Sequence, residues 1–303
     1  MSDKTQSLKA EPVVRCENTI GEGPLWMHSS RRLIWTDIFK KNLYSLDPKT
    51  GQTLCREQQS YIACCGETGS GRLIAAGGRG WVLLDEDLCA AQPFEGVPFD
   101  DKNVRFNDGK IGPDRAFWVG TMDLKATDPI ASLYRLAALE GTTAASLGSG
   151  VEVREMERGL TISNGIGWSP DARKMYLTDS KTGTIFSYDF DVAAGRMQNR
   201  RNLIRDTEQS GVPDGMAVDA EGNIWSARWG GGTVICYDPK GTQRARIELP
   251  AVLVSSCCFG GDHLDTLYIT TARYGLAEPG ELDGALFACN RAGRGRPSYR
   301  FSV

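Results

Sequence analysis

The hydrophobic pattern of this chain is repetitive. Short apolar stretches, each centred on one large residue, recur at spacings of 39 to 58 residues. Their central residues, which we call anchors, are Trp35, Ile74, Trp118, Tyr176, Trp225 and Tyr268. A second apolar run that ends in a turn follows each anchor, and no window of about 11 residues shows helical periodicity. Several strands per unit at a period of roughly 40–50 residues predict an all-β fold, a six-bladed β-propeller.

The repeat also predicts the domain organisation. It fills nearly the whole chain, so we expect a single domain over residues 1–303, with residues 1–11 flexible. A ring of blades must be closed by a strand from one terminus, and either residues 13–16 or residues 299–303 can supply it. The longest interval between anchors contains two predicted surface loops, at 125–130 and 141–150, which we expect to cover one end of the axis.

Polar residues stand at equivalent places before five of the anchors, at a distance of 11 to 13 residues. They are Glu22, Asn107, Asn164, Asp214 and Ser256. Equivalent positions of radially arranged blades face one axis, so these oxygen-bearing side chains are expected to converge. Asn-Gly and Asp-Gly pairs are also strong turn signals, which leaves a backbone explanation open for each pair alone. Turn chemistry does not explain Glu22, whereas carboxylate and amide oxygens suit a hard cation such as Ca²⁺, Mg²⁺ or Mn²⁺.

Composition excludes several classes of function. The chain has 35 basic and 38 acidic residues and no dense basic run, so we expect no nucleic-acid partner. It contains no apolar stretch of about 18 residues and no apolar segment near its start, so we expect no membrane partner and a cytoplasmic protein. The nine cysteines include adjacent pairs, which indicates packing residues rather than a disulfide framework. With only two histidines, a zinc site built on several histidines is nearly excluded.

Six motifs resemble those of the SMP-30/gluconolactonase family, which includes luciferin-regenerating-enzyme-like proteins. In chain order they are Gly21-Glu22-Gly23-Pro24-Leu25-Trp26, Arg105-Phe106-Asn107-Asp108-Gly109-Lys110, Gly120-Thr121-Met122, Ser163-Asn164-Gly165, Pro213-Asp214-Gly215-Met216 and Ser256-Cys257-Cys258-Phe259-Gly260-Gly261. The resemblance implies a six-bladed propeller with one divalent metal ion on its axis, held by Glu22, Asn164 and Asp214. It also implies hydrolysis of an aldonolactone to its acid, in pentose or hexose oxidation, with Arg105 and Asn107 contacting the sugar lactone. Asp214 is then expected to be both metal ligand and proton acceptor.

One departure from the family pattern affects substrate recognition. The animal gluconolactonase branch has an acidic residue three places after the Gly-Thr-Met methionine, and here that place holds Lys125. Lys125 is therefore a candidate for contact with a substrate carboxylate or hydroxyl, although a solvated loop lysine is the more ordinary interpretation. The preferred lactone stays open, as do the metal (Ca²⁺, Mn²⁺, Mg²⁺, Zn²⁺ or Fe²⁺) and the choice between a monomer and a small homo-oligomer.

Three other functions remain compatible with the sequence. One is a calcium-binding regulatory propeller whose ion is structural, which leaves Arg105 and Asn107 without a task. Another is a related metal-dependent esterase or phosphotriesterase. The third is a protein-binding scaffold, which would not need the ordered polar set at the axis.

Overall fold

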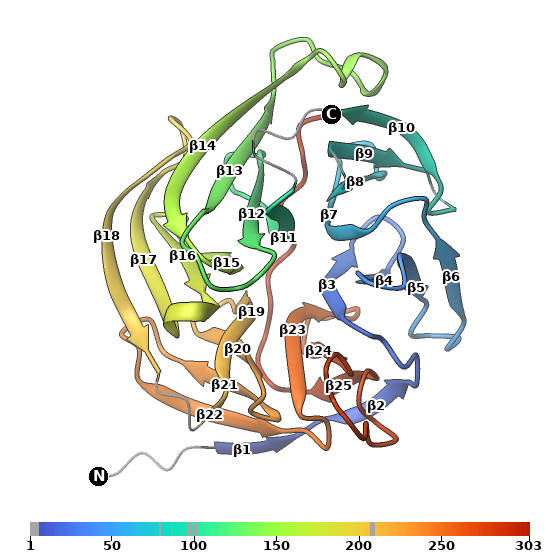
Figure 1. The fold of residues 1–303 in the computed structure, drawn as a ribbon, viewed down its shortest axis with the longest axis vertical. Coiled ribbons are helices and arrows are strands. Elements are labelled where there is room, and N and C mark those ends of the chain that lie inside the picture. The colour runs from blue at the N-terminus through green and yellow to red at the C-terminus, as the bar shows by residue number, and fades with distance from the viewer. Residues whose placement is uncertain (1–5, 79, 86, 96–98, 100–101, 207–209) are drawn as a thin grey trace.

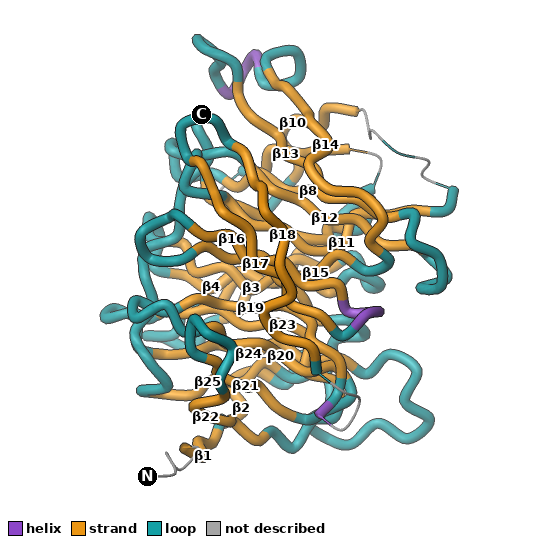
Figure 2. Tube along the Cα trace, turned by 90° about the vertical axis from the view of Figure 1, so that its left-hand side faces the viewer, coloured by secondary structure: helices purple, strands orange, loops and turns teal. Residues whose placement is uncertain are grey.

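The computed structural model describes residues 6–78, 80–85, 87–95, 99, 102–206 and 210–303. Nearly all regular structure in this part of the chain is β-strand, as Figure 2 shows, and the helices η1 (Ala144–Ser146) and η2 (Ser180–Thr182) are single 3-10 turns. The expectation of an all-β protein is confirmed. No helix in these ranges is long and apolar enough to span a membrane.

Four antiparallel sheets contain four strands each, in chain order. The first sheet has β3 (Gly21–Met27), β4 (Arg32–Asp37), β5 (Asn42–Leu46) and β6 (Thr53–Glu57), and the second has β7 (Ile62–Glu67), β8 (Leu73–Gly77), β9 (Gly80–Leu84) and β10 (Ala90–Glu95). The third has β11 (Val104–Ile111), β12 (Phe117–Asp123), β13 (Ala131–Ala138) and β14 (Val151–Leu160), and the fourth has β15 (Ser163–Trp168), β16 (Lys174–Asp179), β17 (Thr184–Asp191) and β18 (Arg196–Arg205).

The remaining strands form one nine-stranded sheet. It contains β19 (Val212–Val218), β20 (Ile224–Trp229), β21 (Thr233–Tyr237) and β22 (Gln243–Glu248), with β1 (Gln6–Lys9) added in parallel to β22, and β23 (Leu253–Gly260), β24 (Thr266–Ala272), β25 (Leu286–Asn290) and β2 (Glu11–Val14). The two halves are joined by a single pairing, Trp229 with Leu253. Each half therefore resembles the separate four-stranded sheets.

The sheets stand around a common centre, in a propeller-like arrangement (Figure 1). The innermost strands β3, β7, β11, β15, β19 and β23 contact one another in this order, and β23 contacts β3 again. Residues from the second half of every innermost strand line one cavity, so these strands run in the same direction. We call the end of the ring where they begin the site end and the end where they stop the tail end.

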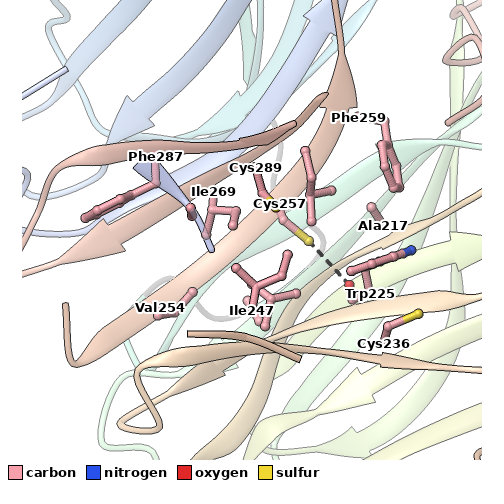
Figure 3. Packing of buried hydrophobic residues seen from close by; sticks show 14 of the residues in the cluster. Ala217, Trp225, Cys236, Ile247, Val254, Cys257, Phe259, Ile269, Phe287 and Cys289 are labelled. Atoms are coloured by element: carbon pink, nitrogen blue, oxygen red, sulfur yellow. Dashed lines mark hydrogen bonds between the residues drawn. The ribbon is translucent and has the colours of Figure 1, made fainter. Parts of the chain in front are cut away.

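The anchors of the sequence repeat occupy the second strand of each unit: β4, β8, β12, β16, β20 and β24. All six are buried, because both faces of a middle strand pack against neighbouring sheets. Between the two halves of the nine-stranded sheet, Trp225, Ile247, Val254 and Phe287 pack together, and Cys257 Sγ lies 3.3 Å from the carbonyl oxygen of Trp225 (Figure 3). All nine cysteines are free, and most are buried, as expected for packing residues.

The N-terminal segment closes the ring. Strand β2 pairs with β25 through Glu11 with Ala288 and Val14 with Leu286, so residues 11–14 supply the closing strand rather than residues 299–303. Within the segment that the sequence analysis expected to be flexible, residues 6–9 form β1, which pairs in parallel with the edge of β22. Residues 1–5 lie outside the described residues.

The C-terminal residues 291–303, which we call the tail, cross the tail end of the ring instead (Figure 1). Gly295 donates a backbone hydrogen bond to Leu264, and Phe301 exchanges backbone hydrogen bonds with Glu67 and Gly69. The tail therefore links opposite parts of the ring. Of the two loops expected over the axis, 125–130 leaves β12 at the site end, whereas 141–150 projects at the outer rim, away from the centre.

Candidate functional site

The predicted site residues lie near the beginning of the innermost strands. Glu22, Arg105 and Asn164 are the second residues of β3, β11 and β15, Asp214 is the third of β19, and Asn107 is the fourth of β11. Because these strands run in the same direction around one centre, equivalent positions reach the same end. The repeat in the sequence thus becomes a cluster at the site end.

Each innermost strand also carries a break in register at this place. The breaks fall between Glu22 and Leu25, Ile62 and Cys64, Phe106 and Gly109, Asn164 and Ile166, Pro213 and Met216, and Val254 and Ser256. A β-bulge of this kind redirects a side chain that regular alternation would place on a sheet face. The bulges therefore explain how the polar side chains leave the apolar layers between the sheets.

Two of the glycines that directly follow a polar site residue are needed for this geometry. Gly23 has φ +54°, a backbone conformation that other residues adopt only with strain. At Gly215 a Cβ atom would stand 2.0 Å from Ser256 Oγ on the neighbouring strand, so only glycine lets β19 and β23 approach so closely.

Several contacts show that the polar residues meet. Asn107 Nδ2 donates a hydrogen bond of 3.0 Å to the carbonyl oxygen of Ser163, which directly precedes Asn164. A Cβ placed on Gly165 would lie 2.6 Å from the carbonyl oxygen of Asp214, so β15 and β19 nearly touch here. The Asp214 carboxyl interacts electrostatically with Glu22 and Arg105. The structure therefore brings together Glu22, Arg105, Asn107, Asn164 and Asp214.

Two oxygens of this cluster have no hydrogen-bond partner among the described residues. They are Asn164 Oδ1 and Asp214 Oδ1, and both are buried. The amide nitrogen of Asn164 donates a hydrogen bond of 3.1 Å to Ser180 Oγ. Buried polar atoms are nearly always paired, so such an orphan calls for an ion, a water molecule or a ligand. With the carboxylate of Glu22, the available donors are all oxygens, a set that fits a hard divalent cation.

The predicted ligand set has only two carboxylates. No group of three or more His, Cys, Asp or Glu side chains placed to hold a metal is found in the described ranges. A metal at this site would therefore depend on the amide oxygen of Asn164.

Burial and mutual repulsion raise the pKa values of the carboxyl groups. Burial, followed by the nearby charge of Asp108, raises the pKa of Glu22 to about 8. Burial, followed by the charges of Glu22 and Asp108, raises the pKa of Asp214 well above its usual range. Arg105 opposes both shifts only in part, because the effect of its charge on the two carboxyl groups is smaller than the effect of burial. A cation bound between these carboxylates would relieve the repulsion.

Arg105 is surrounded by residues that the sequence analysis did not single out. Its Nη1 donates a hydrogen bond of 2.7 Å to the carbonyl oxygen of Phe106, and its charge interacts with Tyr61 and Tyr274. Tyr61 precedes β7 and Tyr274 follows β24, so neither belongs to the repeated motif. The sequence carries no periodic signal for them, since they come from loops of unequal length.

Asp108 and Lys110 were also missed. Asp108 is buried and accepts the amide hydrogen of Gly109 at 2.7 Å, while Lys110 Nζ donates to the carbonyl oxygen of Met216 at 2.8 Å and so connects β11 to β19. Both line a cavity of about 110 Å³ at the tail end, which residues 296–299 of the tail also line. The Asp108-Gly109 pair reads as a turn in the sequence, which conceals the buried carboxylate.

Lys125 is not part of the buried cluster. It is exposed in the loop after β12, and no contact of its ammonium group is recorded within the described part of the chain. The loop is held by Asp123, whose Oδ2 accepts the amide hydrogens of Thr127 and Asp128 at 2.8 and 2.9 Å. These bonds lower the pKa of Asp123 to about 2, so the charged carboxylate stabilises the loop.

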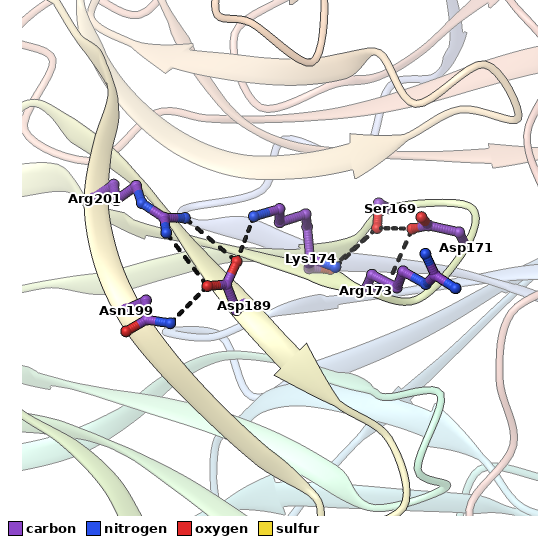
Figure 4. Close-up of polar contacts among 7 residues, drawn as sticks. All are labelled: Ser169, Asp171, Arg173, Lys174, Asp189, Asn199 and Arg201. Atoms are coloured by element: carbon purple, nitrogen blue, oxygen red, sulfur yellow. Dashed lines mark hydrogen bonds and ion pairs between the residues drawn. The ribbon is translucent and has the colours of Figure 1, made fainter.

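A surface cluster on β17 and its neighbours gives a useful contrast (Figure 4). The Asp189 carboxylate pairs with Lys174, accepts Asn199 Nδ2 at 2.7 Å and lies 3.3 Å from Arg201. Its hydrogen bonds to Lys174, Asn199 and Arg201 lower its pKa, the opposite of the shift at Glu22. All its acceptor positions are occupied by the protein, so it is a structural cluster and not a candidate site.

Comparison with known proteins was consistent with this geometry. Pentonolactonase XacC of Haloferax volcanii is 36% identical over 301 residues, which cover 96% of this chain and 97% of the relative. Regucalcin of Danio rerio is 32% identical over 276 residues, 89% of this chain and 88% of the relative. Among solved structures, the calcium-binding protein regucalcin of Agrobacterium tumefaciens superposes with a TM-score of 0.88 at 26% identity, covering 99% of both chains.

The family match covers most of the molecule. Residues 20–273 match the SMP-30/Gluconolactonase/LRE-like region, a span that includes every predicted site residue. The resemblance noted from the sequence motifs is thus confirmed, and the chain belongs to the SMP-30/gluconolactonase/LRE-like family.

Proposed function

We propose that this protein hydrolyses a sugar lactone to the corresponding aldonic acid with the help of one divalent metal ion. The observation that carries the proposal is the buried cluster of Glu22, Asn164 and Asp214, with two oxygens that lack a partner among the described residues. The similarity to a pentonolactonase supports a lactone as the substrate.

Glu22, Asn164 and Asp214 would hold the ion, since they supply two carboxylates and one neutral oxygen. A divalent ion there supplies positive charge for the oxyanion that forms when an ester carbonyl is attacked. The same ion would keep both carboxylates ionised, against the effect of burial.

The protein's own residues bind and orient the substrate. The amide nitrogen of Asn107 donates a hydrogen bond to the carbonyl oxygen of Ser163, so Asn107 Oδ1 would accept a hydrogen bond from a sugar hydroxyl. The guanidinium of Arg105 lies beside the cluster and can bind ring or carbonyl oxygens in a fork. Lys125 would reach the substrate from the loop after β12.

Asp214 is the proposed proton acceptor. A water molecule attacks the carbonyl carbon while its proton passes to the Asp214 carboxylate. The ring C–O bond then breaks, and the proton passes to the departing alkoxide oxygen, so atoms and charge balance. Binding a cation lowers the basicity of a carboxylate, so the second oxygen of Asp214 is the one assigned to the proton.

We further propose that the repeated sheets are the six blades of one propeller domain over residues 1–303, with the metal on its axis. Six innermost strands that contact one another in a circle support this count. A cytoplasmic setting and a place in pentose or hexose oxidation belong to the same proposal, supported by nine free cysteines and by the pentonolactonase relative.

The test starts with protein freed of metal by chelator. Acid release from a panel of five- and six-carbon aldonolactones is followed while Ca²⁺, Mn²⁺, Mg²⁺, Zn²⁺ or Fe²⁺ is added back singly. Activity that disappears without metal and returns with one ion supports the proposal. Hydrolysis no faster than the spontaneous rate with every ion and lactone would reject it.

A second candidate function is calcium binding without catalysis, because several relatives are named regucalcin and one solved relative is described as a calcium-binding protein. This function predicts that the protein binds Ca²⁺, measured by calorimetry, yet opens no lactone. The related esterase or phosphotriesterase activity would appear in the same assay with aryl ester and phosphotriester substrates.

A further inference from the structure

Large apolar side chains that remain exposed gather on loops at the site end. Among the described residues these are Phe39, Leu124, Ile130, Val252 and Tyr274, against Val13, Leu139 and Val192 elsewhere. Water contact with large apolar groups is unfavourable, and such groups around a polar site commonly contact a ligand. The part of the site end that can contact a ligand therefore includes these exposed apolar side chains as well as the buried polar cluster.

Phe39 and Tyr274 form a stacked pair within this group. Phe39 lies in the connection between β4 and β5, and Tyr274 in the long connection between β24 and β25. Their ring centroids are 5.2 Å apart with an interplanar angle of 4°, although Phe39 is 52% and Tyr274 53% exposed. Stacking fixes the direction of each ring while leaving about half of it open to a ligand.

The backbone also fixes Tyr274. Its amide donates a hydrogen bond of 3.1 Å to the carbonyl oxygen of Thr19, and the preceding amide of Arg273 bonds to Asn18. Both partners lie within three residues of the start of β3, the strand that carries Glu22. Tyr274 is thus held at a constant position relative to the site, although it lies in a loop.

The phenol of Tyr274 lies near Arg105, with which it interacts electrostatically. Within the described residues its hydroxyl has no recorded hydrogen bond to protein, and a phenol can both donate and accept one. If the lactone carbonyl lies at Asp214, as the proposed function requires, the hydroxyls far from the carbonyl would extend toward Arg105 and Tyr274, which interact with each other.

We propose that Tyr274 determines substrate specificity: its hydroxyl binds a hydroxyl of the sugar lactone that is distant from the carbonyl, and Phe39 positions the ring. The inference rests on the proposed lactonase function and deepens it. A site that hydrogen-bonds a substrate hydroxyl discriminates against an analogue that lacks the hydroxyl. The protein should therefore favour polyhydroxylated lactones over unsubstituted ones.

The test compares Tyr274→Phe with the unchanged protein on ribonolactone and on γ-butyrolactone, which has no hydroxyl groups. Tyr274→Phe keeps the stack and loses only the hydroxyl. We expect KM for ribonolactone to rise about tenfold with kcat nearly unchanged, and kinetic constants for γ-butyrolactone within about twofold. Phe39→Leu should shift KM in the same direction by a smaller factor.

Tyr299→Phe serves as the matched control, because this tyrosine belongs to the tail at the other end of the ring. Calorimetric titration of the metal-loaded proteins with ribonate gives a readout independent of turnover, and Tyr274→Phe should weaken this binding about tenfold. If Tyr274→Phe equals the unchanged protein on ribonolactone and in ribonate binding, or loses equally on both lactones, the inference is wrong and the lactonase function stands. If the unchanged protein opens no lactone with any metal, both fall together.

Discussion

Two buried glutamates on neighbouring innermost strands show how the ends of the ring differ. At the tail end Glu67, the last residue of β7, accepts the amide hydrogens of His28 and Ser29 at 3.0 and 3.1 Å and pairs with Arg300 of the tail at 3.1 Å. At the site end Glu22 accepts the amide hydrogen of Gly23, at 2.9 Å, and no second hydrogen bond to its carboxylate is found among the described residues. Both side chains are buried, yet among the described residues Glu67 has an ion-pair partner and Glu22 has none, and the charge of Arg105 offsets only part of the effect of burial on Glu22.

The same contrast holds for the surroundings of the two residues. At the tail end Phe301 is fully buried, Lys110 bonds to Met216 and backbone hydrogen bonds hold the tail. At the site end Asn164 and Asp214 keep oxygens without partners among the described residues, and the rings of Phe39 and Tyr274 stay half-exposed. One end of the strands thus stabilises the ring, and the other holds polar groups ready for a ligand at some cost in stability.

The largest effect should come from Asp214→Asn. Removing the proposed proton acceptor should lower lactonase activity by about 10²- to 10⁴-fold, since general-base catalysis contributes on this scale. Calorimetry should show weaker metal binding as well. Asp189→Asn, at the structural cluster of Figure 4, is the matched control and should leave activity unchanged. Equal activity of both variants would contradict the assignment.

Phe301→Ala should lower the stability of the protein and leave catalysis nearly unchanged. Emptying the position of a fully buried phenylalanine typically costs about 3–5 kcal/mol of unfolding free energy, and here it should also loosen the tail. Denaturant unfolding measures the loss. At a temperature low enough to keep the variant folded, its lactonase activity per folded molecule should stay within about twofold of that of the unchanged protein. A large drop in kcat with little loss of stability would show that the tail end takes part in the reaction.

The two glutamates should respond to the same substitution with opposite signs. Glu67→Gln removes the charge that pairs with Arg300 and should destabilise the protein by about 1–3 kcal/mol. Glu22→Gln removes a buried charge that has no ion-pair partner among the described residues, and should stabilise the metal-free protein at pH 8 by a comparable amount. Thermal unfolding in chelator compares the two. The contrast between the ends fails if both variants shift the melting temperature in the same direction.

The pH dependence of metal-free stability should be the smallest effect, and Glu22 is the site-end group that contributes to it. The pKa of Glu22 is raised to about 8 in the folded state, so its contribution to stability is fully present below its unfolded pKa of roughly 4.5 and is lost as pH rises through the folded value. Between pH 5 and 8 the metal-free melting temperature should fall by about 2–6 °C, and added metal should stabilise more at pH 8, where protons no longer compete.

Glu22→Gln is the control for this pH dependence. It should flatten the fall in melting temperature and remove most of the response to metal, since one of the two carboxylates is gone. Glu67→Gln should keep both. A wild-type melting temperature that rises from pH 5 to 8 in chelator would contradict the uncompensated site.

Much of the fold could be predicted because its signal is local and repeated. The anchors Trp35 through Tyr268 fall on equivalent second strands, and turns rich in Pro, Asp and Gly separate the strands. The closing strand was left open between two segments, because both are short and extended and only pairing with β25 distinguishes them. Pairing of residues 6–9 was missed, because it depends on the free edge of β22 and not on the segment itself.

The site could be predicted only where the repeat reaches it. Glu22, Asn164 and Asp214 share a position in the repeat, and the parallel course of the innermost strands brings them together. Asp108 was hidden in a turn-like pair, and Tyr61 and Tyr274 come from loops without a period, so no sequence pattern places them beside Arg105.

By itself, the sequence determined the strand repeat, the polar residue in each unit and the family, because these follow from side-chain alternation and from local motifs. The tertiary structure decided the bulges that redirect the polar side chains, the pairing of the termini and the different fates of Glu22 and Glu67. Compensation of a buried charge depends on which distant groups reach it. At the tail end, Arg300 reaches Glu67 because the tail crosses the ring there. At the site end, Arg105 is the only described residue whose charge lowers the pKa of Glu22.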